Sequence, residues 1–381
     1  MPLFPYPYLS RRAFLGAAAT LPLMPEPLFA AVPGDNRLVV ILLRGGMDGL
    51  SLVQPLDDPQ LAALRPDLAL TVGDGLLDLD GQFGLHPAAA PLLALWQARE
   101  LAFVHAVATP YRSATPQHFE AQDMLEACDP RGGGQLTGWL NRALSSIPRT
   151  GARRAENLDG LQGLLLSGPN DSMVSSRPQI PPLGVDEIAF LERLYGGDGG
   201  FQEALRDVGP AQRGDDWIAG AMGLVAERLS AEARLASLSL PGWDTHADQA
   251  MLLATPISQL ATAILSLRAA LSAAVWASTV VLAITEFGRT VAQNAGGGTD
   301  HGTASVALVA GGTLAGGRVL GAWPGLAPDQ LYEGRDLMPT TDMRGLAAAL
   351  LHRQFDISLS SLGGRVFPGF DVSQASDLLG L

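Results

Sequence analysis

Lysine is absent from the 381-residue chain, and all 25 basic residues are arginine. Without an ε-amino group the protein forms no Schiff base with a carbonyl substrate or with pyridoxal phosphate. It also lacks the lysine on which the Walker-type phosphate loop and protein-kinase chemistry depend. These classes of mechanism are therefore excluded, and arginine is the only side chain with a permanent positive charge.

Cysteine is almost as rare as lysine. Cys128 is the single cysteine, so an internal disulfide and any multi-cysteine zinc or iron–sulfur site within one chain are excluded. A metal ion in this protein must therefore have histidine and oxygen ligands.

Positive charge is also scarce, because the formal net charge is −13. Such a chain repels nucleic-acid phosphates and an anionic membrane surface, and no nucleic-acid partner is expected. Beyond the N-terminal segment, no run of about 18 uncharged apolar residues predicts an integral membrane span. The apolar stretch from Met251 to Leu282 is interpreted as a buried helix followed by a strand.

The N-terminal segment carries paired arginines, Arg11 and Arg12, before a mildly apolar stretch that ends in small residues near Ala31. This pattern is typical of a twin-arginine export signal. We expect residues 1–31 to engage the twin-arginine translocation machinery and to be removed, leaving a single domain of residues 32–381 in the periplasm or outside the cell. A disordered N-terminal arm is the alternative interpretation.

The rest of the chain alternates strand and helix patterns. Apolar runs of strand length are Leu38–Leu43, Leu101–Val107, Leu161–Leu166, Leu235–Leu240, Thr279–Ile284 and Ser305–Ala310. Helical patterns are Pro87–Ala98, a helix with Thr115 as its N-cap, and Met251–Ala274. The alternation predicts an α/β sandwich with a mostly parallel sheet. The mainly helical residues 178–234 are predicted to form an insertion or cap.

Polar residues follow four of these strands, at the end where α/β sheets bind ligands. Asp48 follows the first strand, and His118 lies beyond the second. Asp244 and His246 follow Leu235–Leu240, two positions apart and so on one side of an extended backbone. Glu286 follows the next strand. Imidazole nitrogens with carboxylate oxygens suit zinc, manganese or iron better than calcium.

Asp300 and His301 instead precede the strand Ser305–Ala310. Only a short glycine-rich segment joins Glu286 to His301, whereas a parallel crossover usually needs a helix. A hairpin-like connection is therefore predicted, and it places His301 in the same crevice. The remaining histidines are interpreted as structural: His86, His105 and His352.

Seven segments resemble, in order, the signature of the bacterial domain-of-unknown-function family 1501, whose members often carry twin-arginine signals. They are Arg44–Ser51, His118–Gln122, Gly138–Leu140, Asp244–Gln249, Glu286–Arg289, Gly298–Gly302 and Thr341–Asp342. The resemblance covers essentially the whole mature chain. It implies the α/β/α fold of the alkaline phosphatase-like superfamily of phosphatases, sulfatases and phosphomutases, with one or two divalent ions.

The resemblance also implies roles for single residues. Asp244, His246 and His301 resemble the ligands of a first metal ion, and Asp48 resembles a ligand of a second. In the superfamily an aspartate followed directly by a histidine contributes to the metal site. Glu286 occupies the position of that aspartate, but Phe287 occupies the position of the histidine, so the second ion site is expected to be weakened or absent. The complete set of candidate ligands is Asp48, His118, Asp244, His246, Glu286, Asp300 and His301, and the expected ion is zinc or manganese.

A nucleophile is harder to identify. The superfamily carries it near the start of the helix after the second strand, which leaves Ser113 and Thr115, the latter also interpreted as an N-cap. Gln117 occupies a position where this family commonly has serine. Formylglycine chemistry is rejected because Arg131 stands one place too early after Cys128.

These residues predict metal-assisted hydrolysis of a small phosphate or sulfate ester or a glycan-derived substrate. The side chains that can clamp the anion are Arg44, Arg112 and Arg289, although Arg289 can equally pair with Glu286 or Asp300. The alternative is a non-catalytic, metal-containing binding or assembly protein. A serine hydrolase is not expected because the chain has no Gly-X-Ser-X-Gly elbow, and no glycine-rich turn opens a helix as a dinucleotide site requires.

Overall fold

The computed structural model describes most of the chain, in the ranges 28–31, 35–56, 58–130, 137–147, 163–170, 173–174, 216–231 and 233–378. Residues 1–27 of the predicted export signal and 178–215 of the predicted insertion lie outside the described residues. The last four residues of the predicted signal form strand β1 (Leu28–Ala31), which pairs with the central sheet.

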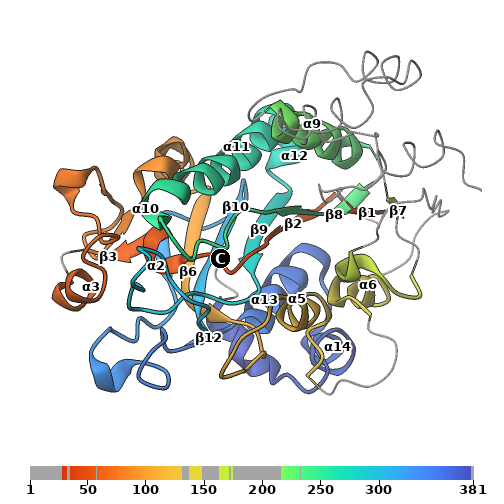
Figure 1. Ribbon diagram of the computed structural model, residues 1–381. Coiled ribbons are helices and arrows are strands. Elements are labelled where there is room, and N and C mark those ends of the chain that lie inside the picture. Colours follow the sequence, from red (N-terminus) through yellow and green to blue (C-terminus); the bar gives the residue numbers. More distant parts are fainter. Residues whose placement is uncertain are drawn as a thin grey trace, which may run out of the picture.

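The fold is mixed α/β around a nine-stranded, mostly parallel sheet, as the alternating pattern predicts (Figure 1). The strand order is β11-β6-β10-β9-β2-β8-β1-β7, and β12 pairs with β6. The strands that carry the core are β2 (Arg37–Leu43), β6 (Leu101–Ala108), β8 (Ala233–Leu240), β9 (Thr279–Thr285) and β10 (Ser305–Gly311). Shorter strands complete the sheet: β7 (Met173–Val174), β11 (Arg318–Leu320) and β12 (Thr341–Asp342). A separate three-stranded sheet contains β3 (Val53–Pro55), β4 (Leu77–Asp78) and β5 (Phe83–Leu85).

The direction of β10 positions one of the candidate ligands. Strand β2 runs parallel to both β8 and β9, whereas β10 pairs antiparallel with β9, with Leu308 opposite Ala283. The hairpin-like connection predicted between Glu286 and His301 is thereby confirmed. The start of β10 consequently lies at the same sheet edge as the ends of β2, β8 and β9.

Helices cover both faces of the sheet (Figure 1). One face carries α4 (Leu93–Gln97), α9 (Asp216–Ser230), α11 (Ala254–Ala270) and α12 (Ala273–Trp276). The other carries α5 (His118–Ala127), α6 (Trp139–Leu144), α13 (Met343–Phe355) and α14 (Leu359–Ser361). The remaining short helices are α2 (Gly49–Leu52), α3 (Pro59–Leu64), α10 (Gln249–Leu252), η1 (Val72–Asp74), η2 (Pro87–Leu92), η3 (Leu164–Leu166), η4 (Pro328–Gln330), η5 (Leu362–Val366) and η6 (Val372–Leu378).

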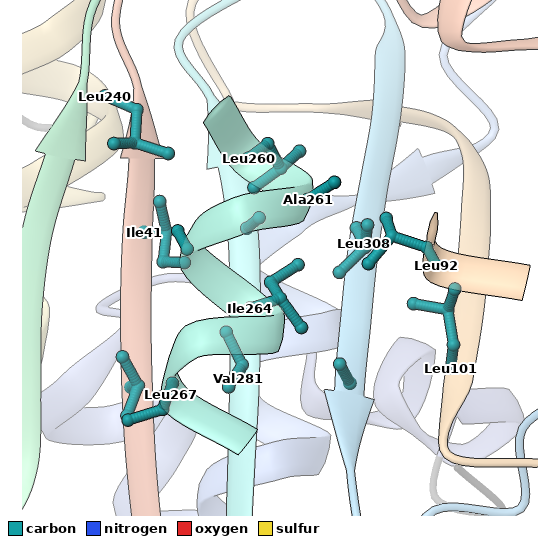
Figure 2. Packing of buried hydrophobic residues seen from close by; sticks show 14 of the residues in the cluster. Ile41, Leu92, Leu101, Leu240, Leu260, Ala261, Ile264, Leu267, Val281 and Leu308 are labelled. Atoms are coloured by element: carbon teal, nitrogen blue, oxygen red, sulfur yellow. The ribbon is translucent and has the colours of Figure 1, made fainter. Parts of the chain in front are cut away.

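The apolar side chains of the central strands alternate between these two layers. Ile41 of β2 faces the layer of α11, where Ile264 and Leu267 pack over β2 and β9 (Figure 2). Its neighbours Val40 and Leu42 face the layer of α13 on the opposite side. The strand is buried on both faces, and this is why its sequence is an uninterrupted apolar run instead of an alternating one.

Within the described part of the chain, one helical stretch, Gln249–Ala270, is long and apolar enough to cross a membrane by length and composition. Its second part, α11, instead packs on the sheet and against α9, with residues such as Ile264 and Leu267 fully buried. The apolar stretch predicted to be a core helix is therefore a core helix. Helix α9 lies near the end of residues 178–234, the segment predicted as a cap, and belongs to the same helical layer as α11.

Two local predictions are wrong. The described part of the strand predicted at Leu161–Leu166 is a 3₁₀ turn, η3, because the backbone N–H of Leu165 donates to the Glu126 carboxylate (2.7 Å) instead of to a strand. Helix α5 begins at His118 with Gln117 as its N-cap, so Thr115 is not a cap. Pro116, predicted as the first helical residue, lies before the helix, and its carbonyl contacts the ring of His301 (2.9 Å).

Strand β6 contains a bulge that buries a histidine. The register of β6 with β10 shifts next to His105 and Ala106, and Ala106 has a left-handed backbone (φ 54°). The His105 ring contacts the Val53 carbonyl through Nε2 (2.8 Å) and accepts from the Ala106 N–H through Nδ1 (3.0 Å). Burial lowers the pKa of His105 to about 4, so the ring is neutral in the folded protein, as the structural interpretation of this residue requires.

This buried imidazole predicts a pH-dependent stability. In the unfolded chain His105 titrates near its ordinary pKa of 6.5, but in the folded protein it titrates at about 4. Between these values only the unfolded state binds the proton, so acidification from about pH 6.5 to pH 4 lowers the free energy of unfolding, by about 3 kcal/mol. Urea denaturation at a series of pH values measures this loss. His105→Gln, which keeps a donor for Val53, should flatten the pH dependence, and an unchanged slope would contradict the assignment.

Candidate functional site

The sheet brings five candidate ligands to one edge. Asp244 and His246 follow β8, Glu286 follows β9, His118 begins α5 after β6, and His301 precedes β10. Contacts between their side chains, described below, join all five. This convergence is the arrangement expected from the strand ends and the antiparallel β10.

The carboxylate of Asp244 lies at the centre of the cluster. Its oxygens are 3.0 Å from Nε2 of His246, 3.2 Å from Nε2 of His301 and 3.3 Å from Nε2 of His118. His118, Asp244 and His301 each offer one ligand atom, all within 4.8 Å of one another. Because the side chains of Asp244 and His246 are 46% and 44% exposed, the cluster is open to solvent on one side.

The other ring nitrogen of each histidine faces an outer acceptor, which forms a hydrogen bond with His118 and with His301. Nδ1 of His118 contacts Glu286 (3.0 Å), Nδ1 of His301 contacts the carbonyl of Pro116 (2.9 Å), and Nδ1 of His246 lies 3.5 Å from Asp300. A partner at Nδ1 fixes the ring and directs Nε2 inward, as in the outer sphere of protein metal sites. Nε2 of His118 is buried and has no hydrogen-bond partner within the described part of the chain.

The charges of the cluster follow from these contacts. Partial burial opposes ionisation of Asp244, but the hydrogen bond and charge of Arg289 outweigh it and lower its pKa to about 2. Burial lowers the pKa of His301, so this ring is neutral near pH 7. The hydrogen bond with Glu286 raises the pKa of His118 despite partial burial. The cluster is therefore an anion surrounded by imidazoles.

Glu286 lies behind His118. The carboxylate is fully buried and accepts from the N–H of Gly45 (2.9 Å), from Gln122 (3.2 Å) and from Thr285 (3.0 Å) as well as contacting His118. Burial opposes its ionisation, yet these hydrogen bonds, that of His118 first, keep its pKa below the usual value. Its contacts are those of a residue that orients His118.

Arg289 is buried at the base of the cluster with a side chain that is 0% exposed. One nitrogen donates to the carboxylate of Asp244 (2.6 Å). This nitrogen, Nη2, also donates to the carbonyls of Gly45 and Trp243, whereas Nε donates to Gly46 and Nη1 to Thr299, so the guanidinium contacts three loops. The sequence predicts Glu286 or Asp300 as a carboxylate partner of Arg289, whereas the structure pairs Arg289 with Asp244.

The other two candidate anion clamps also have internal partners. Arg44 forms an ion pair with Glu126 (2.6 Å) and donates to Ser239 (3.2 Å). Arg112 is exposed and donates to the carbonyls of its own loop, at Thr109 and Tyr111 (both 2.6 Å).

Asp48 is placed in a buried ion pair that sequence reasoning missed. Its side chain and that of Arg65 are each 1% exposed, and Nη1 of Arg65 lies 2.6 Å from the carboxylate. Ser51 (2.7 Å) and Gln249 donate to the same oxygen. Burial opposes ionisation of Asp48, but the Arg65 charge and these hydrogen bonds lower its pKa. The structure gives this candidate ligand a cationic partner from within the chain.

The candidate nucleophiles lie in the segment before α5. Ser113 and Thr115 are exposed, and the Ser113 hydroxyl accepts from the N–H of Thr115 (3.2 Å). The neighbouring Pro116 carbonyl contacts His301, so this segment borders the cluster. Asp300 is 63% exposed and accepts from Asn294 (3.1 Å), at the rim beside His246.

Phe287 forms the apolar floor of the cluster. Its ring centroid lies 5.0 Å from that of His118 and 4.6 Å from that of His301. Gly46 accommodates the ring, because a Cβ at this position would lie 2.4 Å from the Phe287 ring, and its backbone is left-handed (φ +67°). An apolar ring therefore lines the cluster at this position, and Phe287 offers no ligand atom.

Comparison with known proteins identifies one family. A family model described as "Protein of unknown function (DUF1501)" matches residues 191–366. No curated protein matches the chain. Two solved structures are similar, "Crystal structure of Ps i-CgsB in complex with k-i-k-neocarrahexaose" and "Crystal structure of Ps i-CgsB". They are 9% and 10% identical, have TM-scores of 0.38 and 0.37, and the alignments cover 89% of this chain and 74% of each of theirs.

The buried pair of Asp48 and Arg65 predicts a large effect on stability. Asp48→Ala leaves a guanidinium without its charge partner in the interior and should lower the free energy of unfolding by about 3–5 kcal/mol. The double variant Asp48→Leu/Arg65→Met should lose less, because no charge remains buried. Urea denaturation measures both.

Arg268→Ala is the matched control, because it breaks a partly exposed pair with Glu100 (3.3 Å) and should cost only about 1 kcal/mol. Equal losses for Asp48→Ala and Arg268→Ala would show that the Asp48 pair is not a buried charge interaction.

Proposed function

The chain belongs to the DUF1501 family, and we propose that it is an exported metal-dependent hydrolase that acts on a phosphate or sulfate ester. Asp244, His118, His246 and His301 hold the ion. The observation that carries the proposal is that three imidazoles direct Nε2 at one carboxylate, while Nδ1 of His118 and of His301 is held by a hydrogen bond from outside.

The residues present fit a divalent cation. Two ligand atoms with bonds of about 2.0 Å to one tetrahedral ion lie roughly 3.3 Å apart. The separations between Asp244 and the three Nε2 atoms are 3.0, 3.2 and 3.3 Å. The buried Nε2 of His118 has no hydrogen-bond partner among the described residues, and its lone pair would be used if this nitrogen coordinated a cation. Histidine and carboxylate ligands favour zinc or manganese over calcium.

The chain's own groups supply the setting for hydrolysis. A bound divalent ion supplies Lewis acidity, which stabilises negative charge on a substrate oxygen. Arg289 keeps Asp244 ionised, and Glu286 holds the ring of His118. The exposed side of Asp244 and His246 admits a substrate, and Ser113 or Thr115 in the bordering segment are the candidates to attack it.

The anionic group of the substrate needs positive charge. Arg289 and Arg44 are committed to carboxylates of the protein, so Arg112 is the remaining candidate clamp from the sequence analysis. It lies in the loop that leads to Ser113. In this proposal the ion contributes most of the attraction for a small anionic ester or glycan-derived substrate.

Export rests on the paired arginines, Arg11 and Arg12, before the apolar segment. In this proposal the protein folds before it crosses the membrane on the twin-arginine machinery and acts in the periplasm or outside the cell. We propose in addition that the α/β/α sandwich has the alkaline phosphatase-like arrangement that the resemblance implies.

A non-catalytic metal protein is the second candidate. Two observations favour it. Gln117 is the N-cap of α5, where the family commonly has serine, so a nucleophile is missing at that position. Arg289 pairs with Asp244 and is buried, so it is not available to bind a substrate anion. Such a protein binds the ion and a partner without cleaving an ester.

Metal content tests the centre directly. Protein recovered from the periplasm should contain zinc or manganese by elemental analysis, and Asp244→Ala and His301→Ala should lose it. His352→Ala is the matched control, because this half-buried histidine of α13 contacts only the Ile357 carbonyl (2.9 Å) among the described contacts and should retain the metal.

Hydrolysis of p-nitrophenyl phosphate and p-nitrophenyl sulfate decides between the two candidates. The hydrolase proposal expects turnover that disappears in both metal-site variants. Metal without turnover of either ester supports the binding protein. Wild-type protein without metal, or metal retained in Asp244→Ala and His301→Ala, would falsify the metal centre.

A further inference from the structure

The side chain of Gln249 joins the two segments that carry the candidate ligands. Gln249 is the first residue of α10 and is 0% exposed. Its Oε1 accepts from the hydroxyl of Thr245 (3.0 Å) and from the hydroxyl of Thr299 (2.7 Å). Thr245 lies between Asp244 and His246 in the chain, and Thr299 lies two residues before His301.

The backbone supports the same junction. The N–H of Gln249 donates to the carbonyl of Gly297 (3.0 Å), and the N–H of Thr299 donates to the carbonyl of Thr245 (3.3 Å). The ligand loops after β8 and before β10 therefore meet at one amide side chain. A shift of this amide would move both loops relative to each other.

The buried ion pair fixes the orientation of that amide. Nε2 of Gln249 donates to the carboxylate of Asp48 and to Ser51 (3.2 Å), and Asp48 in turn pairs with Arg65. An inverted amide would place Oε1 against the carboxylate, which offers only acceptors. Arg65 also donates to the carbonyls of Thr290 and Val291 (both 2.7 Å), in the connection between β9 and β10.

We propose that Gln249 is a positioning residue of the metal centre, which holds Asp244 and His246 in register with His301 through the hydroxyls of Thr245 and Thr299. This inference rests on the proposed function, because it assigns a task toward the ion. It also gives Asp48 a task other than binding a second ion: with Arg65, it sets the donor and acceptor ends of the Gln249 amide.

The test compares Gln249→Met with Gln354→Met in the full-length protein. Gln354 is also buried and donates to the Arg37 carbonyl (2.8 Å), where β2 begins, at the opposite end of the strand from the cluster. Each variant loses buried amide hydrogen bonds, but only Gln249→Met loses those to the ligand loops. Zinc affinity is measured by competition with a chromophoric chelator, and Co²⁺ substitution gives a visible spectrum that reports the ligand geometry.

Gln249→Met should bind Zn²⁺ about 10–100-fold more weakly and show a changed Co²⁺ spectrum, as loss of outer-sphere support does in metal sites. Gln354→Met should keep both wild-type values. If both variants lose stability but bind Zn²⁺ as tightly as the wild type, Gln249 is merely structural and the inference is overturned.

Two further results keep the test decisive. If Gln249→Met does not fold, Thr299→Val, which removes one hydroxyl donor at nearly constant volume, must weaken Zn²⁺ binding, and unchanged binding overturns the inference. If the wild type itself binds no metal, the proposed function fails. Metal bound equally by wild type and Gln249→Met rejects only the role of Gln249.

Discussion

A single guanidinium, that of Arg289, ties together the loops from which the candidate centre is built. It donates to carbonyls that follow β2 and β8 and to one that precedes β10, and it pairs with Asp244. Buried carbonyls without donors would destabilise the fold, so these loops converge where the donors are. The same guanidinium holds the pKa of Asp244 at about 2 and keeps the central carboxylate charged. Loop geometry and site charge therefore depend on one side chain.

The reversed direction of β10 is the second constraint. In an all-parallel sheet, a residue that precedes a strand lies at the opposite edge from residues that follow strands. Because β10 runs antiparallel between β6 and β9, His301 lies at the edge where β8 and β9 end. The glycine-rich turn before it is short enough to carry Arg289 and His301 into direct backbone pairing. One reversed strand thus supplies both a candidate ligand and the loop that Arg289 clamps.

Residues next to strand ends could be predicted from the sequence, and residues that support them could not. Asp244, His246, Glu286 and His301 follow from apolar runs, the strand-end rule and the short link before β10. Gln249 and Asp48 are 201 positions apart, and no periodicity reports a hydrogen bond at that separation. The 3₁₀ turn at Leu164–Leu166 was missed because a short apolar run fits a strand equally well. The spacing of apolar residues in a sequence indicates which residues are buried and whether they form a helix or a strand. It does not indicate which polar side chains meet in the interior, because that depends on the tertiary packing.

The presence of arginine at position 289, in a chain without lysine, has a physical consequence at this site. The guanidinium of Arg289 makes contacts with five acceptors, four of them carbonyls and one the carboxylate of Asp244. Arginine has five N–H donors in a planar fork and remains protonated when buried, whereas a lysine ammonium has three donors and loses its proton readily on burial. A lysine at position 289 would leave acceptors unsatisfied and would weaken the charge that keeps Asp244 ionised. A carboxylate must be ionised to bind a metal ion, and Arg289 contributes to the site by keeping Asp244 in this form.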